Sequence, residues 1–526
     1  MVGRGPSVSV GPMLIARVFG LSGALCGLLA CTGCNIEGPS SDGEGAVTAE
    51  VQRLPAAVAW SEEPPDQFLV AEAPQFVAVT FDDNFISGLG DVKGGMTWVT
   101  DLLRGKTNPV GNGTVGTFDG TPVRTTFFFT SLYIETDDGN RSAWRTAVMD
   151  GHEAADHTVH HSDGTEFSAT DWQSEVGGCI SELVSPDIGI GIATSDIIGF
   201  RSPYLAYNPN LVPVLQQNAL VYDSSVQSCW QDSENGTNCA WPYTLDAGSP
   251  DASTVTEKFQ RPGLSTNAGF WEIPLPALIV PSDDLAAEYG ITPGLRDRIP
   301  PDMPLPSFYE KATGKIAALD ATLFVDAGLT ATEVLGVLKY NLDLHLNGNR
   351  SPLVFVAHSH VYADNYGAAM NALSVTDRQG AIASFLDYAL SKPEVRMRPL
   401  RDLVNWLSAP TALNGVRLPR PPTGGAGGNA GSGGSAGVGG VAGSGGTFAA
   451  GGPSAGAGGA NSGTSGASMG PGSVSGQSSC RMGTKPASGA GWFVGGWALL
   501  AIFRRRKRGR ALVTFARGAR ARILSR

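Results

Sequence analysis

A glycine-rich stretch at residues 423–476 limits how much of this 526-residue chain can fold. It carries almost no charge and few large apolar side chains, so it buries too little apolar surface to offset its conformational entropy. We interpret residues 411–479 as a flexible linker. Residues 58–410 are then the foldable domain, and a single α/β barrel can reach that length.

The N-terminus has the pattern of an export signal. A basic residue precedes the apolar run 18–30, which is shorter than the ~20 apolar residues that span a bilayer. We therefore predict a signal peptide at residues 1–34 and a linker at residues 35–57. The small residue before Cys31 resembles a bacterial lipoprotein box. Cys34 is the alternative lipidation site, and an ordinary cleaved signal is the alternative interpretation.

The C-terminal residues 480–526 have the pattern of a second anchor. Cys480 is followed by the apolar run 491–503, and ten of the 37 Lys and Arg residues lie in the 23 residues after that run. By the positive-inside rule this basic cluster stays in the cytoplasm. The layout resembles the C-terminal sorting tags of myxobacterial surface proteins, and a plain tail anchor is the alternative. We expect an exported protein, anchored at the cell envelope or cell surface through an N-terminal lipid, this membrane segment, or both.

Charge and cysteine content narrow the partners and the compartment. Without its basic tail the chain is more acidic than its formal net charge of -11 indicates, which argues against a nucleic-acid partner. Cys229 and Cys239 lie close together in a polar loop, so a disulfide between them is expected in an oxidising compartment. Cys179 then stays unpaired, although three cysteines leave other pairings open.

The domain alternates segments of strand pattern with segments of helical spacing. Such alternation predicts parallel pairing, and about seven units without a nucleotide-type glycine loop favour a β/α barrel over an open doubly wound sheet. Functional residues then belong at the C-terminal ends of strands. The strand candidates are 76–81, 124–129, 197–200, 220–222, 271–274, 352–357 and 395–397. The helix candidates include 98–103, 211–217, 332–344 and 378–390.

Two groups of polar residues stand out in this frame. Asp82 and Asp83 follow the first predicted strand. Adjacent carboxylates repel each other and desolvate at a strand end, a cost that a cation relieves, although a solvated turn is the alternative. Four of the seven histidines lie within residues 152–161. His157 and His161 share one face if they lie on a helical turn.

Two imidazoles and a carboxylate form a common zinc ligand set that leaves positions open for water and substrate. From spacing alone His160, three residues after His157, reaches the same face. His152 is expected to be structural or to lie just behind the ligands.

The sequence TFDD at residues 80–83, followed by HTVHH at 157–161, resembles the first two motifs of the polysaccharide deacetylases, the NodB-homology domains of carbohydrate esterase family 4. The resemblance implies a distorted (β/α)7 barrel, selects His161 over His160, and makes Asp82 the catalytic base. The metal ligands that it implies are Asp83, His157 and His161.

Three later motifs follow in the family's order. FRSPY at 200–204 is similar to the third, in which Arg201 orients the base and the backbone N–H of Tyr204 helps to hold the oxyanion. YDSS at 222–225 resembles the fourth, in which Asp223 orients the catalytic acid.

NRSPLVFVAH at 349–358 resembles the fifth motif as chitin deacetylases carry it, and makes His358 the acid. His360 is the competitor, because it lies on the same side if the strand continues. The chain departs from the family pattern at Asn84, at Ser202, and after Asp223, where the loop between Cys229 and Cys239 replaces the common Asp-Trp.

The resemblance implies a metal-dependent hydrolase that removes N-acetyl groups from a surface or extracellular polysaccharide, either chitin-like or peptidoglycan N-acetylglucosamine. Asp82 takes a proton from water and His358 gives one to the departing amine. The divalent metal is expected to be zinc, with cobalt and nickel as alternatives. The alternative functions are an O-acetyl esterase that uses the same centre and a non-catalytic surface carbohydrate-binding protein.

Overall fold

The computed structural model describes residues 57–250, 252–369 and 373–419. The predicted signal peptide, both candidate lipidation cysteines, most of the glycine-rich linker and the C-terminal anchor lie outside these residues. Within the described residues, no helix combines the length and apolar character needed to cross a membrane. The packed body continues past the predicted boundary at residue 410, because Ala412 and Leu413 are buried.

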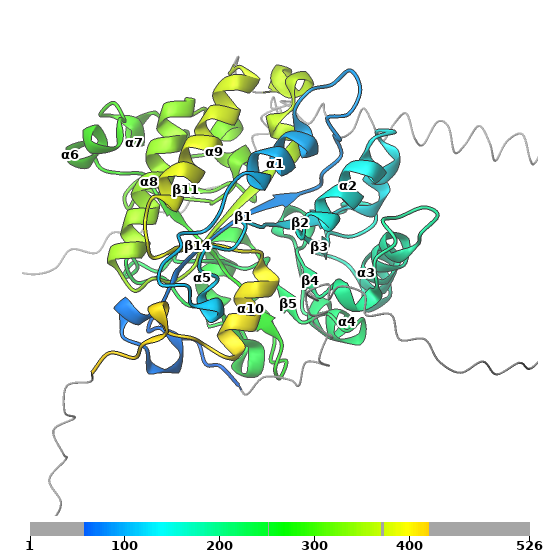
Figure 1. The fold of residues 1–526 in the computed structure, drawn as a ribbon, viewed down its shortest axis with the longest axis horizontal. Helices are drawn as coiled ribbons and strands as arrows, with labels where there is room; N and C mark the ends of the chain where they lie inside the picture. The colour runs from blue at the N-terminus through cyan, green and yellow to red at the C-terminus, as the bar shows by residue number, and fades with distance from the viewer. Residues whose placement is uncertain (1–56, 251, 370–372, 420–526) are drawn as a thin grey trace, which may run out of the picture. The chain divides into compact units, whose positions relative to one another are not determined.

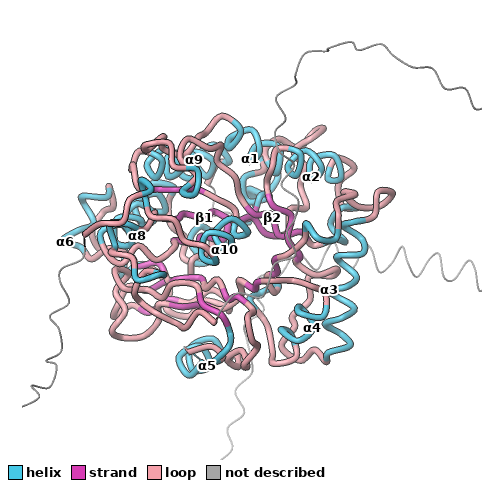
Figure 2. Tube along the Cα trace, turned by 60° about the horizontal axis from the view of Figure 1, so that its bottom comes forward, coloured by secondary structure: helices cyan, strands magenta, loops and turns pink. Residues whose placement is uncertain are grey.

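A curled, mainly parallel sheet forms the centre of the molecule, with helices around it (Figures 1 and 2). Along the described chain, parallel strands run in the order β13-β1-β2-β3-β4-β5-β8, and β7 (Tyr243–Thr244) adds an antiparallel edge to β8. The predicted α/β barrel class is confirmed. The parallel strands are β1 (Gln75–Asp82), β2 (Thr126–Phe129), β3 (Glu153–Asp156), β4 (Gly199–Phe200), β5 (Tyr222–Asp223), β8 (Trp271–Glu272) and β13 (Leu353–His358).

Smaller pieces of sheet complete the fold. Strand β14 (Val395–Met397) pairs in parallel with the start of β1. Strands β6 (Gln227–Ser228) and β9 (Leu275–Pro276) form a parallel pair. A separate antiparallel sheet consists of β10 (Leu278–Ile279), β12 (Lys315–Ile316) and β11 (Tyr309–Glu310).

The helices cover the outside of the sheet and close one of its ends. Helix α1 shows why: its buried Met96, Val99 and Leu103 recur at intervals of three to four residues and form one apolar face. Helix α10 instead packs at the N-terminal ends of the strands, where Leu400 N–H donates to the Thr126 hydroxyl. The helices are α1 (Gly95–Arg104), α2 (Asn140–Met149), α3 (Ala169–Val184), α4 (Leu211–Gln217), α5 (Ala252–Phe259), α6 (Asp283–Ala286), α7 (Leu295–Arg298), α8 (Ala331–Asn347), α9 (Val375–Leu390) and α10 (Leu400–Ser408).

The strand alternation separates two packed cores. On β1, Val77, Val79 and Phe81 pack with the outer helices, whereas Phe76 and Ala78 belong to a second cluster inside the barrel. The same alternation occurs on β13 and β2. Because side chains alternate across a strand, the inner face of β1 continues through Thr80 to Asp82. The register thus aims the last residue of the strand at the inside of the barrel.

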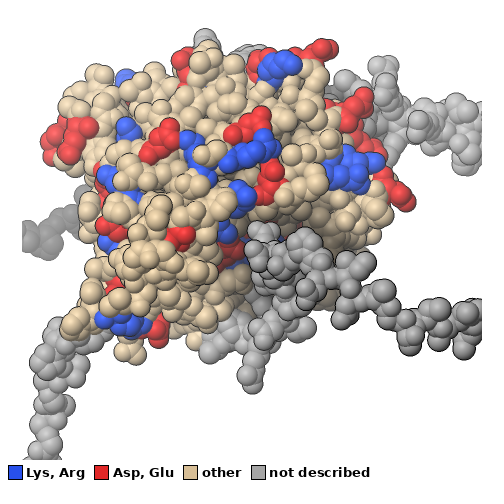
Figure 3. Space-filling model, in the orientation of Figure 1, with Lys and Arg blue, Asp and Glu red and all other residues tan. Residues whose placement is uncertain are grey.

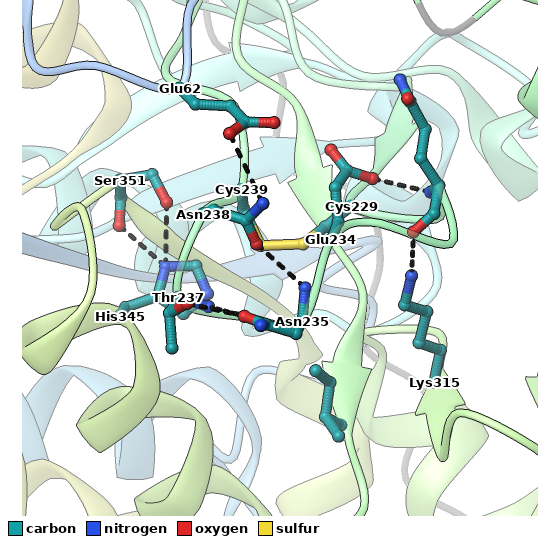
Figure 4. The surroundings of a disulfide bond; sticks show 12 residues. Glu62, Cys229, Glu234, Asn235, Thr237, Asn238, Cys239, Lys315, His345 and Ser351 are labelled. Atoms are coloured by element: carbon teal, nitrogen blue, oxygen red, sulfur yellow. Dashed lines mark hydrogen bonds between the residues drawn. A yellow bond between two sulfur atoms is a disulfide. The ribbon is translucent and has the colours of Figure 1, made fainter. Parts of the chain in front are cut away.

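The predicted disulfide between Cys229 and Cys239 is present (Figure 4). Cys179 is buried and forms no disulfide. The loop that the disulfide closes is fastened to the segment that leads into β13. Asn349 N–H donates to the Thr237 carbonyl at 2.7 Å, and the Asn349 amide donates to the Cys239 carbonyl at 2.7 Å. The disulfide loop therefore helps to fix where β13 begins.

Charged side chains of both signs are interspersed on the face drawn in Figure 3. Ion pairs among the described residues include Arg104 with Asp150 and Lys258 with Glu310.

Candidate active site

Neighbouring strands bring two of the predicted residues to one edge of the sheet. In the parallel ladder of β1 and β13, Asp82 lies opposite His358. Both residues end their strands and follow the inner-face positions, so their side chains enter the barrel at its C-terminal rim. Asp82 is buried and His358 is half-buried.

Asp83, His157 and His161 form the expected cluster. Their ligand atoms all lie within 4.8 Å of one another. Asp83 Oδ1 lies 3.0 Å from His161 Nε2 and 3.6 Å from His157 Nε2. Asp83 has a positive φ of 66°, so the chain turns at this residue and its carboxylate points to the histidines instead of following the strand alternation.

The two histidines do not lie on a helical turn. Strand β3 ends at Asp156, and an irregular loop follows in which Thr158 and His161 have φ values of 68° and 52°. Asp156 Oδ1 accepts the Thr158 N–H at 2.8 Å, and the Thr158 hydroxyl accepts the His161 N–H at 3.1 Å. These two side chains hold a tight turn, in which the ring centroids of His157 and His161 lie 5.1 Å apart.

The other histidines of this segment point elsewhere. His160 is exposed, and its Nδ1 lies 2.8 Å from Glu175 Oε1. His152 is buried behind β2, where its Nδ1 accepts the Thr125 N–H at 3.2 Å, and burial lowers its pKa to about 4. The structure therefore brings His161 and not His160 to Asp83, and gives His152 a structural place.

The donor set fits a divalent cation. His157 Nδ1 lies 2.7 Å from the Arg201 carbonyl oxygen, so Nδ1 carries the proton and the lone pair of Nε2 faces Asp83. Asp83 Oδ1 is buried, and no hydrogen-bond donor satisfies it among the described residues. Burial lowers the pKa of His157 to about 4, which keeps the ring neutral. Burial opposes ionisation of Asp83, but the nearby histidines, led by His161, together outweigh it, so the pKa of Asp83 lies well below its ordinary value. Convergent lone pairs beside a carboxylate suit a metal ion.

Arg201 is fully buried at the end of β4 and braces Asp82. Its Nη1 donates to Asp82 Oδ1 at 2.8 Å and to the Thr80 hydroxyl at 2.6 Å. Its guanidinium lies 4.2 Å from the centroid of the Phe128 ring. The expected contact between Arg201 and Asp82 is thus present. Thr80 and Asp82, both on the inner face of β1, accept hydrogen bonds from the same guanidinium group.

Tyr204 lies at the rim of the cluster. Its φ of 56° turns the chain after Pro203, and its ring lies 4.6 Å from that of His161. The centroid of the Tyr133 ring lies 6.1 Å from that of His161. Tyr204 is exposed, so this edge of the cluster is open to solvent.

The prediction that Asp223 holds His358 is wrong, because Asp320 makes that contact. His358 Nδ1 lies 2.6 Å from Asp320 Oδ1, and His358 N–H donates to Asp320 Oδ2 at 2.8 Å. Burial by itself would lower the pKa of His358, but Asp320 outweighs it, helped by Asp83 and Asp82, and the pKa rises to about 9.

Asp223 faces a different part of the site. Its Oδ1 accepts the Ser225 hydroxyl at 2.6 Å, and its neighbour on β8 is Glu272. All three residues are fully buried. The sequence showed Asp223 as a strand-end carboxylate, but no local signal connected it with Glu272 on the next strand.

His360 is close to the site but differs from His358 in its surroundings. Its ring stacks on Phe85 at 4.1 Å and meets Tyr366 at 4.7 Å. Burial, and after it the nearby charge of His358, lowers the pKa of His360 to about 3. A neutral, stacked imidazole is a poor proton donor, so the geometry favours His358 over His360 as the acid.

Asp320 is the site residue that the sequence reasoning missed. It follows the short apolar run 316–319, in which Leu319 forms a parallel bridge with Val356 of β13. An apolar run that ends in Asp is the same signal that marked Asp82. The run was too short to predict as a strand.

Comparisons with known proteins agree with these motifs. Residues 71–222 match the family model for polysaccharide deacetylase. Chitin deacetylase 1 of Bombyx mori is 24% identical over 303 residues, which cover 56% of this chain and 45% of that protein. The chain thus spans less than half the length of this curated relative.

Solved structures of similar proteins are more distant. A Mycobacterium smegmatis protein assigned to the polysaccharide deacetylases is 17% identical, with a TM-score of 0.36 over 70% of this chain and 98% of that one. A family 4 carbohydrate esterase from Streptomyces lividans is 19% identical, with a TM-score of 0.21 over 46% of this chain and 97% of that one. The resemblance to the polysaccharide deacetylases that the motifs indicate is confirmed, and its family match covers residues 71–222.

Proposed function

We propose that this protein is a metal-dependent hydrolase that removes N-acetyl groups from a polysaccharide of the cell envelope or the extracellular matrix. One observation carries the proposal. The cluster of three potential metal ligands has two further groups beside it, a carboxylate that an arginine holds and a histidine that a second carboxylate holds. These groups are Asp82 with Arg201, and His358 with Asp320.

Asp83, His157 and His161 would hold the metal. A divalent cation bound there supplies a Lewis acid that polarises an acyl oxygen and acidifies water. One carboxylate and two imidazoles suit zinc, and cobalt or nickel accept the same ligands. The loop after β3 positions the ligands before any metal arrives, because its turn is held by protein hydrogen bonds.

Asp82 serves as the general base. Arg201 and the strand register hold its Oδ1, which leaves Oδ2 to take the proton of the attacking water. Arg201 only donates to the carboxylate, so it orients the base without accepting the proton itself.

His358 serves as the general acid. Asp320 occupies its Nδ1, so Nε2 is the nitrogen left to face the substrate. With a pKa of about 9 the ring is charged at neutral pH. An amine leaves poorly as an anion, so a positioned proton donor speeds its departure, typically by ~10²–10⁴-fold.

Export and anchoring remain part of the proposal. The Cys229–Cys239 disulfide is consistent with an oxidising compartment outside the cytoplasm. A protein tethered to the envelope meets insoluble polymers at the surface, which suits a chitin-like or peptidoglycan substrate.

The test is acetate release by the full chain from a panel of N-acetylated glycans and acetylated xylan, with and without a chelator. We expect release from at least one N-acetylated glycan and its loss with the chelator. Release from acetylated xylan alone would indicate an O-acetyl esterase. Binding of a glycan without any acetate release would indicate a non-catalytic carbohydrate-binding protein.

A further inference from the structure

We propose that the N-terminal end of the barrel, opposite the active site, rests on a lipid bilayer and so holds the active site away from it. The inference goes beyond deacetylation, and it rests on the anchoring that forms part of the proposed function. The surface concerned consists of five exposed apolar side chains, here called the basal surface: Leu69, Val110, Val115, Val416 and Leu418.

The basal surface holds five of the nine large apolar side chains that are exposed among the described residues. Val115 is 85% exposed, Val110 72% and Val416 60%. Apolar side chains exposed singly are common on soluble proteins, but a group of them on one face marks a contact with another molecule or with a membrane. The basal surface is therefore a candidate for such a contact.

Hydrogen bonds between three distant segments bring these side chains to one face. The Asn112 amide donates to the Asn414 carbonyl at 2.7 Å, which fastens the loop that carries two of the valines to the segment that carries the third. The Glu72 carboxylate accepts the backbone N–H of Leu69 at 2.7 Å and also that of Leu418. The five side chains thus belong to one surface of the folded domain.

This surface lies at the end of the barrel where the strands begin. Asn108, in the same loop as two of the valines, accepts the Met397 N–H through Oδ1 at 2.6 Å, and Met397 pairs with Val77 near the start of β1. From Gln75 to Asp82 this strand has eight residues, a length of about 25 Å at ~3.3 Å per residue. A bilayer in contact with the basal surface therefore leaves the C-terminal rim pointing outward, open to a polymer.

The two terminal segments of the described chain lie beside each other near the basal surface (Figure 1). Arg417 Nη1 donates to Asp66 Oδ2 at 2.7 Å, and its guanidinium lies 4.1 Å from the centroid of the Phe68 ring. Beyond these segments, the sequence leads on one side to the candidate lipidation cysteines and on the other to the apolar run 491–503. Both predicted tethers are thus attached near the basal surface, which favours a lipid bilayer over a second copy of the chain as its partner.

Two arginines beside the basal surface favour an anionic bilayer. Arg124 and Arg401 form no ion pair with any described residue; Arg124 Nη1 donates to the carbonyl of Val123. Arg398 Nη1 donates to the Pro122 carbonyl at 2.8 Å, so positive charge gathers where the loop of the valines meets the start of α10. Figure 3 shows Lys and Arg side chains in this region, between α1 and α10. Anionic headgroups attract such side chains, although the chain as a whole has a formal net charge of -11.

The experiment is photo-crosslinking of the full chain to vesicles of phosphatidylcholine and phosphatidylglycerol that contain a photoactivatable phospholipid, followed by digestion and mass spectrometry. We expect crosslinks at a predicted anchor and at the peptides of the basal surface. The yield at the basal surface should exceed that at the peptide with Leu89 by ten-fold or more. Leu89 is the matched reference, because it is 44% exposed and lies in the loop after β1, at the opposite end of the barrel.

Two double variants test which side chains make the contact. Val115→Asp with Val416→Asp should lower the crosslinking yield at the basal surface by five-fold or more and leave the yield at the anchor unchanged, whereas Leu89→Asp should change neither. Arg124→Gln with Arg401→Gln should lower the yield at the basal surface by two-fold or more, but only in vesicles that contain phosphatidylglycerol. Thermal unfolding checks that each variant is folded, and the wild-type yields decide if one is not.

Crosslinks at an anchor, with a yield at the basal surface no higher than at the Leu89 peptide, would overturn the proposal. A basal surface that crosslinks to a second copy of the chain instead of to lipid would overturn it as well. Absence of crosslinks at both anchors and at the basal surface would contradict anchoring and docking together. Acetate release from a soluble glycan requires neither of them, so failure of the docking and failure of the proposed chemistry remain distinguishable.

Discussion

The inner face of β1 is apolar in its N-terminal half and polar in its C-terminal half, although the same strand alternation directs the side chains of both halves into the barrel. At the N-terminal half of β1, Phe76 packs on Trp406 with ring centroids 5.0 Å apart. At the C-terminal half, Thr80 and Asp82 share the Arg201 guanidinium. The apolar half stabilises the fold by burial. The polar half buries groups whose desolvation costs free energy, which their partners and a cation must offset. Stability and chemistry are thus separable along a single strand.

Removal of the metal should give the largest effect. Without a cation, the polar half keeps its fold, because protein hydrogen bonds hold the loop after β3, but loses the Lewis acid. We expect chelation to abolish acetate release and zinc to restore it, while the circular dichroism spectrum of the protein stays unchanged. Loss of the folded spectrum on chelation would break the comparison, since the metal would then be structural.

Asp82→Asn should follow in size. The amide keeps the hydrogen bond to Arg201 in part but cannot take a proton, so we expect acetate release to fall by ~10²–10⁴-fold. The melting temperature should change little. The measurement is initial rate and thermal unfolding on the same zinc-loaded sample. A rate within a few-fold of wild type would remove Asp82 from the role of base.

Trp406→Ala probes the apolar half. Trp406 is 3% exposed and contacts Phe68, Phe76 and Trp241. We expect a loss of about 3–5 kcal/mol in the free energy of unfolding, because a large buried side chain leaves a cavity. Acetate release per folded molecule should remain near wild type at low temperature. A large fall in kcat without loss of stability would show that the two halves are coupled.

The pH dependence of stability and of acetate release tests the pairing of His358 with Asp320 in the polar half. Because the folded-state pKa of His358 is raised from 6.5 to about 9, its pairing with Asp320 stabilises the fold fully below pH 6.5 and is lost as the pH rises through 9. The same deprotonation removes the acid, so the rate of acetate release should fall above pH 9. A profile with its basic limb near pH 6.5 would contradict the raised pKa.

His160→Ala should give the smallest effect. His160 is exposed and pairs with Glu175 outside the ligand cluster. A surface pair of this kind contributes ~0–1 kcal/mol, and zinc affinity should not change. Its matched counterpart, His161→Ala, should lose zinc binding, as isothermal titration can measure. An equal loss of zinc affinity in both variants would contradict the choice of His161 over His160 as the metal ligand.

The sequence predicted what short local signals carry. The strands β1 and β13, the pair Asp82–Asp83 and the placement of His358 follow from apolar runs that end in polar residues. Strand β3 was missed because Glu153-Ala-Ala-Asp156 has no β-branched or aromatic residue. A spacing of four between His157 and His161 fits both a helical turn and the tight turn that is observed, and the side chains of Asp156 and Thr158 hold the latter.

What the sequence did not predict depends on contacts between distant segments. Asp320 is 38 residues before His358 in the chain, and Glu272 meets Asp223 only because β5 and β8 pair. Neither contact has a spacing or a periodicity that one segment reveals. The support of the acid and the base is therefore a property of the folded sheet.

The most direct test of the central claim is acetate release from an N-acetylated glycan measured against added zinc, for metal-free wild type and Asp83→Asn. We predict that wild-type activity rises from zero and saturates at one zinc ion per chain, whereas Asp83→Asn stays inactive at the same zinc concentrations. Acetate release by the metal-free protein, or full activity of Asp83→Asn, would contradict the account.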